Sequence, residues 1–360
     1  MNIQICIRIF CYLCFCIGIL LGKINDKDYR NHIYFSSTNL GELKLSTTAR
    51  CAIKTACYFN PNAKIKLITR IDVSYDKNDI IFQECPSFEV LQMDLIKDLF
   101  KNTPLEQWYH KAKESKTKYF NADLSDAIRT ALMWNYGGVY FDLDMLSLNT
   151  ISNLPLNSMG KQLQSEDKKG RVPLLNGAAM IFQDHHPFID KIINEFNYYW
   201  NPKKFGSVGP DLLWGVYKEM RESVIGRNSN NKDLRSIGDT SDNNNNNISA
   251  TNPKNLPILL PKEVFYPIKF RSGPLKLYFS IPAPKKPWFP SDTIAVHLWS
   301  QLTSKMQVLP ASRGGQIVNN CNSTEFLRDV VSKNNNRRKD TKKSNKKHLF
   351  HNYRDESFIR

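Results

Sequence analysis

Two aspartates, Asp142 and Asp144, stand two residues apart at the end of an alternating apolar stretch that begins after Gly137 and Gly138. The two-residue period of a strand would place both carboxylates on one face. Neighbouring carboxylates repel each other unless a positive charge lies between them. Oxygen ligands suit a hard divalent cation such as Mn²⁺ or Mg²⁺. The spacing therefore predicts a metal site at the end of a strand, although the same spacing is also typical of ordinary surface acids.

A predicted helix precedes this strand. Asn121 and Asp123 are its candidate N-caps, and the two glycines end it because Gly tolerates the left-handed conformation common at helix ends. Asp126 and Arg129 are three residues apart, so they share one face of this helix. As a purely structural pair they would contribute only ~0.3 kcal/mol. Five apolar residues define the opposite, inward face: Leu124, Ala127, Ile128, Ala131 and Leu132.

The flanking segments alternate between strands and helices. Strands are predicted at residues 33–37, 65–69, 88–93, 172–182 (with a turn at Asn176 and Gly177) and 293–299. Helices are predicted to begin at Ser46 or Thr47, at Pro104 and at Pro187, with a last one at residues 321–331. A glycine-containing loop from Phe205 enters a further helix. This alternation favours an α/β fold with a mostly parallel sheet, whose ligands bind at the carboxyl ends of strands.

The amino terminus is continuously apolar over residues 9–22, apart from its cysteines, and is long enough with residues 3–7 to cross a bilayer of ~30 Å. A signal peptide is the shorter alternative. No small-x-small cleavage motif follows Gly22, so we expect a signal anchor at residues 1–22 and a polar stem at 23–30. Either reading sends the remaining chain to the secretory lumen.

The formal charge of +16 lies partly in the last segment, which we expect to be a disordered basic tail at residues 328–360. Residues 228–252 are Asn-rich and are predicted to be a disordered insertion. No nucleic-acid-binding motif accompanies the charge, so nucleic acid is not an expected partner. Four cysteines outside the apolar segment are compatible with two disulfides in an oxidising lumen, with the pairing open; their spacing does not favour zinc. They are Cys51, Cys57, Cys85 and Cys321.

The wider pattern is more specific than the two aspartates. Ser125-Asp126-x-x-Arg129, followed by Gly137-Gly138-x-Tyr140-x-Asp142-x-Asp144, resembles the DXD signature of sugar-nucleotide-dependent glycosyltransferases of the GT-A fold. Four later segments are similar to the α1,4-glycosyltransferase family (lactosylceramide 4-alpha-galactosyltransferase and α1,4-N-acetylglucosaminyltransferase type): Leu175-Asn-Gly-Ala, Phe205-Gly-x-x-Gly-Pro-x-Leu-Leu, Phe265-Tyr-Pro-Ile and Ala295-Val-His-Leu-Trp. The resemblance covers residues 31–327. It departs at the Asn-rich insertion, at the basic tail, at Phe205, where Trp is typical, and at Ser300, where Asn is common.

The resemblance implies a GT-A type, Rossmann-like, mostly parallel sheet with flanking helices. It implies a single lumenal catalytic domain, with a nucleotide-sugar half at 31–160 and a conserved region at 161–327. Asp142 and Asp144 would be the catalytic residues and would hold Mn²⁺ (or Mg²⁺), with His297 as a third ligand; the metal would stabilise the departing UDP. The implied substrate-binding residues are Asp126, Arg129, Asn176, Gly209, Pro210, Asp211 and Trp299.

The activity implied is a retaining transfer of galactose or N-acetylgalactosamine from a UDP-sugar. The sugar would join a terminal sugar of a glycosphingolipid such as lactosylceramide in α1,4 linkage, at the Golgi membrane, by a single-pass type II protein. No Glu or Asp stands out as a covalent nucleophile, which favours a front-face route in which a UDP oxygen takes the acceptor proton. Alternatives are an α1,4-N-acetylglucosaminyltransferase acting on glycoproteins, a catalytically silent sugar-nucleotide-binding protein, and a haloacid-dehalogenase-type phosphatase. Against the phosphatase, Met145-Leu146 stands where Gly-Thr or Gly-Val is typical.

Overall fold

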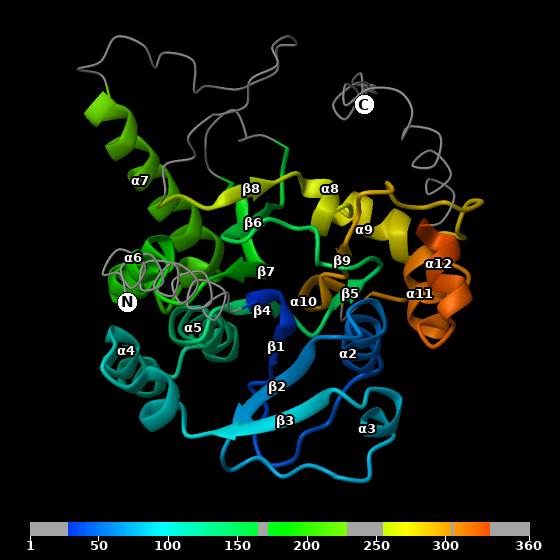
Figure 1. The fold of residues 1–360 in the computed structure, drawn as a ribbon, viewed down its shortest axis with the longest axis horizontal. Helices are drawn as coiled ribbons and strands as arrows, with labels where there is room; N and C mark the ends of the chain where they lie inside the picture. Colours follow the sequence, from blue (N-terminus) through cyan, green and yellow to red (C-terminus); the bar gives the residue numbers. More distant parts are fainter. Residues whose placement is uncertain (1–27, 165–171, 229–254, 304–305, 332–360) are drawn as a thin grey trace, which may run out of the picture.

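A seven-stranded mixed sheet forms the centre of the protein, shown by a computed structural model that describes residues 28–164, 172–228, 255–303 and 306–331 (Figure 1). Strands β3, β2, β1 and β4 are parallel, β7 is antiparallel to β4 and β6, and β8 is parallel to β6. The predicted α/β fold with a mostly parallel sheet is confirmed. In spatial order the strands are β3 (Phe88–Met93), β2 (Lys64–Arg70), β1 (His32–Ser36), β4 (Gly138–Phe141), β7 (Leu175–Phe182), β6 (Ser158–Lys161) and β8 (Ile258–Leu260). 

Two apolar cores lie on opposite faces of this sheet, because successive side chains along each strand point to opposite faces. In β4, Val139 and Phe141 enter one core, with α2 and the carboxyl-terminal helices, whereas Tyr140 enters the other with α4 to α7.

The helices are η1 (Tyr29–Asn31), α2 (Thr47–Phe59), α3 (Ile81–Glu84), η2 (Leu95–Phe100), α4 (Pro104–Ser115), α5 (Phe120–Asn135), α6 (Pro187–Tyr199), η3 (Ser207–Asp211), α7 (Leu212–Asn228), α8 (Lys262–Phe265), α9 (Ser272–Phe279), α10 (Ser300–Thr303), α11 (Arg313–Asn320) and α12 (Thr324–Val331).

The helix-to-strand unit differs from its prediction at both ends. Helix α5 begins at Phe120, and its N-cap residue, Tyr119, makes no side-chain capping bond, so the predicted caps Asn121 and Asp123 are wrong. Strand β4 ends at Phe141 instead of running to Asp144. The chain then turns and enters a separate two-stranded sheet, in which β5 (Met145–Ser147) pairs with β9 (Ala295–His297).

Two further boundaries also differ. Strand β7 runs without interruption through Asn176 and Gly177, so the predicted turn there is wrong. The last predicted helix is two helices, because α11 ends at Asn320 and α12 begins at Thr324. Helix α12 also continues past residue 327, where the predicted domain ends. By contrast, α2 begins where predicted, with the Ser46 side chain accepting from the N–H of Ala49.

The four cysteines outside the apolar amino-terminal segment form two disulfides, which settles the pairing that the sequence left open. Cys51 joins Cys321 and thereby ties α2 to the segment between α11 and α12, whereas Cys57 joins Cys85. Within the described residues, no helix combines the length and apolar character that a bilayer crossing needs. The predicted anchor at 1–22, the Asn-rich insertion (apart from residue 228) and the tail beyond 331 lie outside the described residues.

Asp123 is buried in the first turn of α5, which leads to a prediction about stability. Only one of its carboxylate oxygens has a hydrogen bond among the described residues, from Trp200 Nε1 at 3.1 Å. Burial raises the pKa of Asp123 to about 6, against ~3.9 for an exposed Asp. The folded state therefore binds this proton more tightly than the unfolded state. Stability is lost as pH rises from ~4 to ~6 and is constant above that range.

Replacing Asp123 with Asn should remove this charge while keeping the acceptor for Trp200. We expect the variant to be more stable than the parent by up to ~3 kcal/mol at pH 7.5 and nearly equal to it below pH 4. Urea unfolding at both pH values measures this difference, with the exposed Asp292→Asn as control. A gain of the same size at both pH values would contradict the assignment of the effect to the buried charge.

Candidate active site

Asp142 and Asp144 lie in the turn between β4 and β5, at the carboxyl end of β4. The N–H of Asp142 donates to the carbonyl of Ala178 at 2.9 Å, and the N–H of Met145 donates to the carbonyl of Asp142 at 2.9 Å. The turn redirects the chain into β5, where Met145 stands opposite His297 of β9. The β5–β9 pairing therefore brings a histidine from the carboxyl-terminal part of the chain to the two aspartates.

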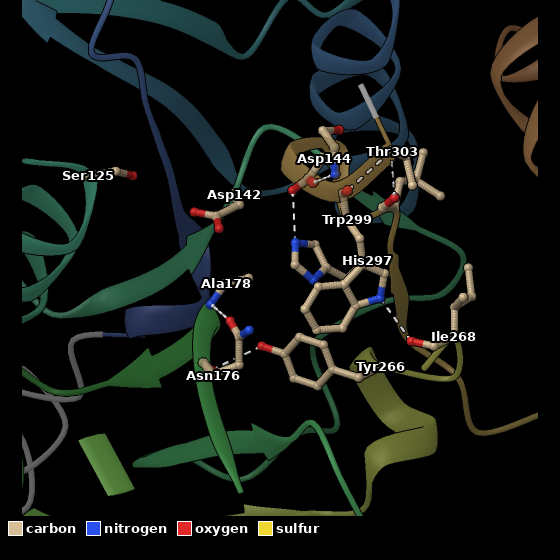
Figure 2. Close-up of polar contacts among 12 residues, drawn as sticks. Ser125, Asp142, Asp144, Asn176, Ala178, Tyr266, Ile268, His297, Trp299 and Thr303 are labelled. Carbon is tan, nitrogen blue, oxygen red and sulfur yellow. Dashed lines mark hydrogen bonds and ion pairs between the residues drawn. The ribbon is translucent and has the colours of Figure 1, made fainter. Parts of the chain in front are cut away.

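These three side chains form a candidate metal site. One ligand atom from each of Asp142, Asp144 and His297 lies within 4.8 Å of the other two. His297 Nε2 is 3.1 Å from Asp144 Oδ1 (Figure 2), and the N–H of Ser300 donates to Asp144 Oδ2 at 2.7 Å. Burial alone would raise the pKa of Asp144, but His297 and the donors of Ser300 hold it below its usual value. Two carboxylates and an imidazole suit Mn²⁺, and the carboxylates also suit Mg²⁺.

Arg129 connects the helix α5 to this site. Its Nη2 is 2.9 Å from Asp142 Oδ1, and its Nη1 is 3.2 Å from Asp126 Oδ1. Both Arg129 and Asp126 are at least nine-tenths buried. Burial raises the pKa of Asp126 to about 7 even though Arg129 acts in the opposite direction. The predicted pair therefore exists, but it lies in the interior, where it holds Asp142.

Two glycines allow the backbone to approach this buried pair closely. A Cβ at Gly209 would lie 2.6 Å from Asp126 Oδ2, and a Cβ at Gly177 would lie 3.0 Å from Arg129 Nη1. The loop at η3 and strand β7 thus pack directly on the ionic pair. The sequence singled out Gly209 for a sugar subsite, whereas the structure places it against Asp126.

The remaining predicted substrate residues lie around this centre with partners of their own. The Asn176 side chain donates to Gln162 and accepts from the N–H of Ala178. Asp211, next to Pro210 in η3, pairs with Lys204 at 2.6 Å. Their contact with a substrate stays a prediction.

Trp299 is only 7% exposed, and its ring centroid is 4.1 Å from that of His297. Its Nε1 donates to the carbonyl of Ile268 at 2.8 Å (Figure 2). The residue also has a φ of 56°, a left-handed conformation that is unusual for a bulky side chain. Trp299 therefore packs under His297 and fixes the segment that carries it; its predicted stacking on a sugar stays a prediction.

Two tyrosines support the site, and sequence reasoning did not identify either as a site residue. The hydroxyl of Tyr140 donates to Asp142 Oδ1 at 2.9 Å and also contacts Ser36 Oγ. The hydroxyl of Tyr266 donates to the carbonyl of Asn176 at 3.0 Å. Tyr140 lies two residues before Asp142 in the alternating strand pattern, so the sequence did place its side chain on the same face as that carboxylate. The contact of Tyr266 joins residues 90 positions apart, so spacing could not predict it, although Tyr266 lies in the family-like segment Phe265-Tyr-Pro-Ile.

Two family descriptions match different parts of this chain. Residues 46–166 match the family described as glycosyltransferase sugar-binding region containing DXD motif, and residues 181–325 match the alpha 1,4-glycosyltransferase conserved region. Lactosylceramide 4-alpha-galactosyltransferase of Pongo pygmaeus is 31% identical over 229 residues, which cover 63% of this chain and 89% of that protein. Its Rattus norvegicus counterpart is 28% identical over 270 residues, covering 73% of this chain and 66% of that protein.

Human alpha-1,4-N-acetylglucosaminyltransferase is 26% identical over 216 residues, covering 58% of this chain and 52% of that protein. The chain thus spans less than two thirds of the length of the rat and human relatives. Among solved structures, the PaToxG glycosyltransferase has 17% identity and a TM-score of 0.41, covering 56% of this chain and 73% of that one.

The two matched regions meet at the candidate site. Asp126, Arg129, Asp142 and Asp144 fall in the first region, and His297 falls in the second. The sheet, with four parallel strands followed by the antiparallel β7, is GT-A-like. The phosphatase alternative is excluded by these matches. The chain belongs to the α1,4-glycosyltransferase family that carries a DXD motif.

Proposed function

We propose that this protein is a metal-dependent retaining glycosyltransferase. It transfers galactose, or N-acetylgalactosamine, from a UDP-sugar in α1,4 linkage to a terminal sugar of a glycosphingolipid such as lactosylceramide. The observation that carries the proposal is the convergence of Asp142, Asp144 and His297 from two distant parts of the chain. Family membership supports the reaction class, and the names of the most similar relatives support the donor and acceptor.

Asp142, Asp144 and His297 would hold Mn²⁺ or Mg²⁺. When bound, such a cation neutralises the diphosphate of the donor and stabilises UDP as a leaving group. The protein keeps the ligands in place beforehand: Arg129 and Tyr140 orient Asp142, while Ser300 orients Asp144. Such preorganised contacts reduce the rearrangement needed at the moment of reaction.

The proposal includes donor binding beside Asp126 and Arg129. The Arg129 guanidinium lies between Asp126 and Asp142. A donor group that binds beside it would therefore contact charged side chains that are already held in place. No step of the proposal requires a covalent sugar–enzyme bond. The front-face route, in which a UDP oxygen takes the acceptor proton, remains the proposed route.

A screen of donors against acceptors tests the proposal. The full chain is incubated with Mn²⁺ and UDP-galactose, UDP-N-acetylgalactosamine or UDP-N-acetylglucosamine, and products are read by mass. Acceptors are lactosylceramide, lactose and a glycoprotein glycan. We expect transfer of galactose or N-acetylgalactosamine to lactosylceramide, lost when EDTA removes the metal. Transfer of N-acetylglucosamine to the glycoprotein alone would select the alternative named by the human relative. UDP binding in calorimetry without transfer to any acceptor would select a silent binding protein.

The close packing of Gly209 on Asp126 gives a prediction for the donor site. In Gly209→Ala the new Cβ would lie 2.6 Å from the carboxylate, so Asp126 or the η3 backbone must shift. We expect a loss of ~1–3 kcal/mol in stability and a rise in the KM for the UDP-sugar. Gly273→Ala is the matched control, since a Cβ there meets nothing within 4 Å. An unchanged donor KM in Gly209→Ala would show that this loop does not position Asp126.

A further inference from the structure

An exposed apolar surface lies in the segment between β8 and α12. Among the described residues, twelve large hydrophobic side chains are at least 36% exposed, and five of these fall between residues 277 and 309. Single exposed apolar side chains are ordinary on protein surfaces, whereas a concentration of them marks a contact surface. The five are Leu277, Ile281, Leu302, Val308 and Leu309.

Four of these residues belong to two chain segments that run side by side. The N–H of Leu309 donates to the carbonyl of Phe279 at 2.8 Å, and Ser280 Oγ donates to the carbonyl of Gln307 at 3.1 Å. The bonds continue beyond Ile281, where the N–H of Ala283 donates to the carbonyl of Ala311. The end of α9 and the segment before α11 therefore present one continuous face. This α9 face consists of Lys276, Leu277, Ile281, Lys285, Val308 and Leu309.

The same region carries an excess of positive charge. Residues 264–323 contain seven Lys or Arg and one acid, Asp292. Lys269, Arg271, Lys276 and Lys285 are exposed, and the structure shows no ion pair between any of them and an acid in the described part of the chain. Exposed apolar side chains among cations are typical of a surface that meets anionic lipid, because the cations contact headgroups while the apolar groups enter the acyl boundary.

The segment that precedes α9 packs against the candidate active site. Phe270 stands between Lys269 and Arg271, and its ring centroid is 5.4 Å from that of Trp299. Trp299 in turn packs against His297 at 4.1 Å. The rings of Trp299 and Phe270 thus lie between His297, the candidate metal ligand, and the backbone of Lys269 and Arg271. Figure 2 shows Trp299 and His297.

We propose that the α9 face docks the protein on an anionic lipid bilayer. A second copy of the chain is the less favourable occupant, because a symmetric contact would bring unpaired cations of the same sign together. The arrival of a glycolipid acceptor from the same bilayer rests on the proposed function. Docking itself does not.

Hydrogen exchange of the full chain tests the docking. The protein is placed in nanodiscs of phosphatidylcholine alone or with phosphatidylserine, so that any amino-terminal insertion is the same in both. We expect amides of residues 276–285 and 306–311 to exchange about tenfold more slowly on the anionic discs, as two surface lysines near anionic lipid permit. The variant Lys276→Glu/Lys285→Glu should lose this protection, as should Leu277→Ser/Ile281→Ser.

Matched controls lie elsewhere on the surface: Lys77→Glu/Lys111→Glu for charge, and Ile80→Ser/Tyr198→Ser for exposed apolar groups. They should keep the protection. Equal exchange on both discs would overturn the proposal, and protection that grows with protein concentration instead of lipid charge would assign the face to a second copy. Transfer to lactosylceramide in discs should fall in the α9-face variants while transfer to soluble lactose is kept. If the parent transfers to neither acceptor, the proposed function fails, and the exchange result still decides the docking.

Discussion

Replacing Asp144 with Asn should reduce sugar transfer by about three orders of magnitude, because a metal that stabilises a leaving group supplies several kcal/mol of the barrier. The side chain contributes one of three ligand atoms within 4.8 Å of one another. Asn keeps an oxygen that can accept from the N–H of Ser300, so the backbone contact to α10 survives. It cannot keep the negative charge beside His297. The loss should therefore fall on metal affinity and rate, with little effect on folding.

The measurement is the initial rate as a function of Mn²⁺ concentration, together with calorimetric binding of UDP with and without metal. Asp142→Asn should lower the rate similarly, and it should also remove the ion pair between Asp142 and Arg129. Asp72→Asn is the matched control, since Asp72 is an exposed partner of Arg70 far along the chain from the site. Undiminished activity in both site variants would reject the metal assignment and leave the aspartates a structural role.

The sequence predicted the α/β class and most strands because these depend on short-range signals. Alternation in β4 separated Val139 and Phe141 from Tyr140, and the two cores of the structure follow that division. The spacing of Asp126 and Arg129 predicted one helix face, and the two side chains are in fact paired. Each of these inferences needed only a few consecutive residues.

The errors share a different cause, since each depended on contacts between distant residues. Asp123 looked like a helix cap, but Trp200 holds it in the interior. The strand prediction ran on to Asp144 because its alternation continued, whereas pairing of β5 with β9 pulls the chain out of the sheet. Asn176 and Gly177 are turn-forming residues, yet β7 stays extended through them, since Leu175 pairs with Lys161 of β6 before them and Ala179 pairs with Phe141 of β4 after them. Local propensity is overridden where tertiary pairing satisfies the backbone better.

Replacing Arg129 with Met should destabilise the protein by ~3–5 kcal/mol, because it leaves two acids near each other without their counter-charge. Asp126 is buried and has Arg129 as its ion-pair partner, and Asp142 loses a contact of 2.9 Å. Met fills much of the same volume, so the loss measures charge more than packing. Urea unfolding gives the free energy, and Arg70→Met, which removes an exposed ion pair with Asp72, should cost under ~1 kcal/mol.

A second substitution separates the charge from the shape of the site. Arg129→Met/Asp126→Asn removes one of the two stranded acids, so it should recover a large part of the stability that Arg129→Met loses. Stability restored without transfer activity would show that Arg129 positions Asp142 for the reaction as well as holding the fold. If the double variant were no more stable than Arg129→Met, the burial of Asp126 could not be the source of the cost.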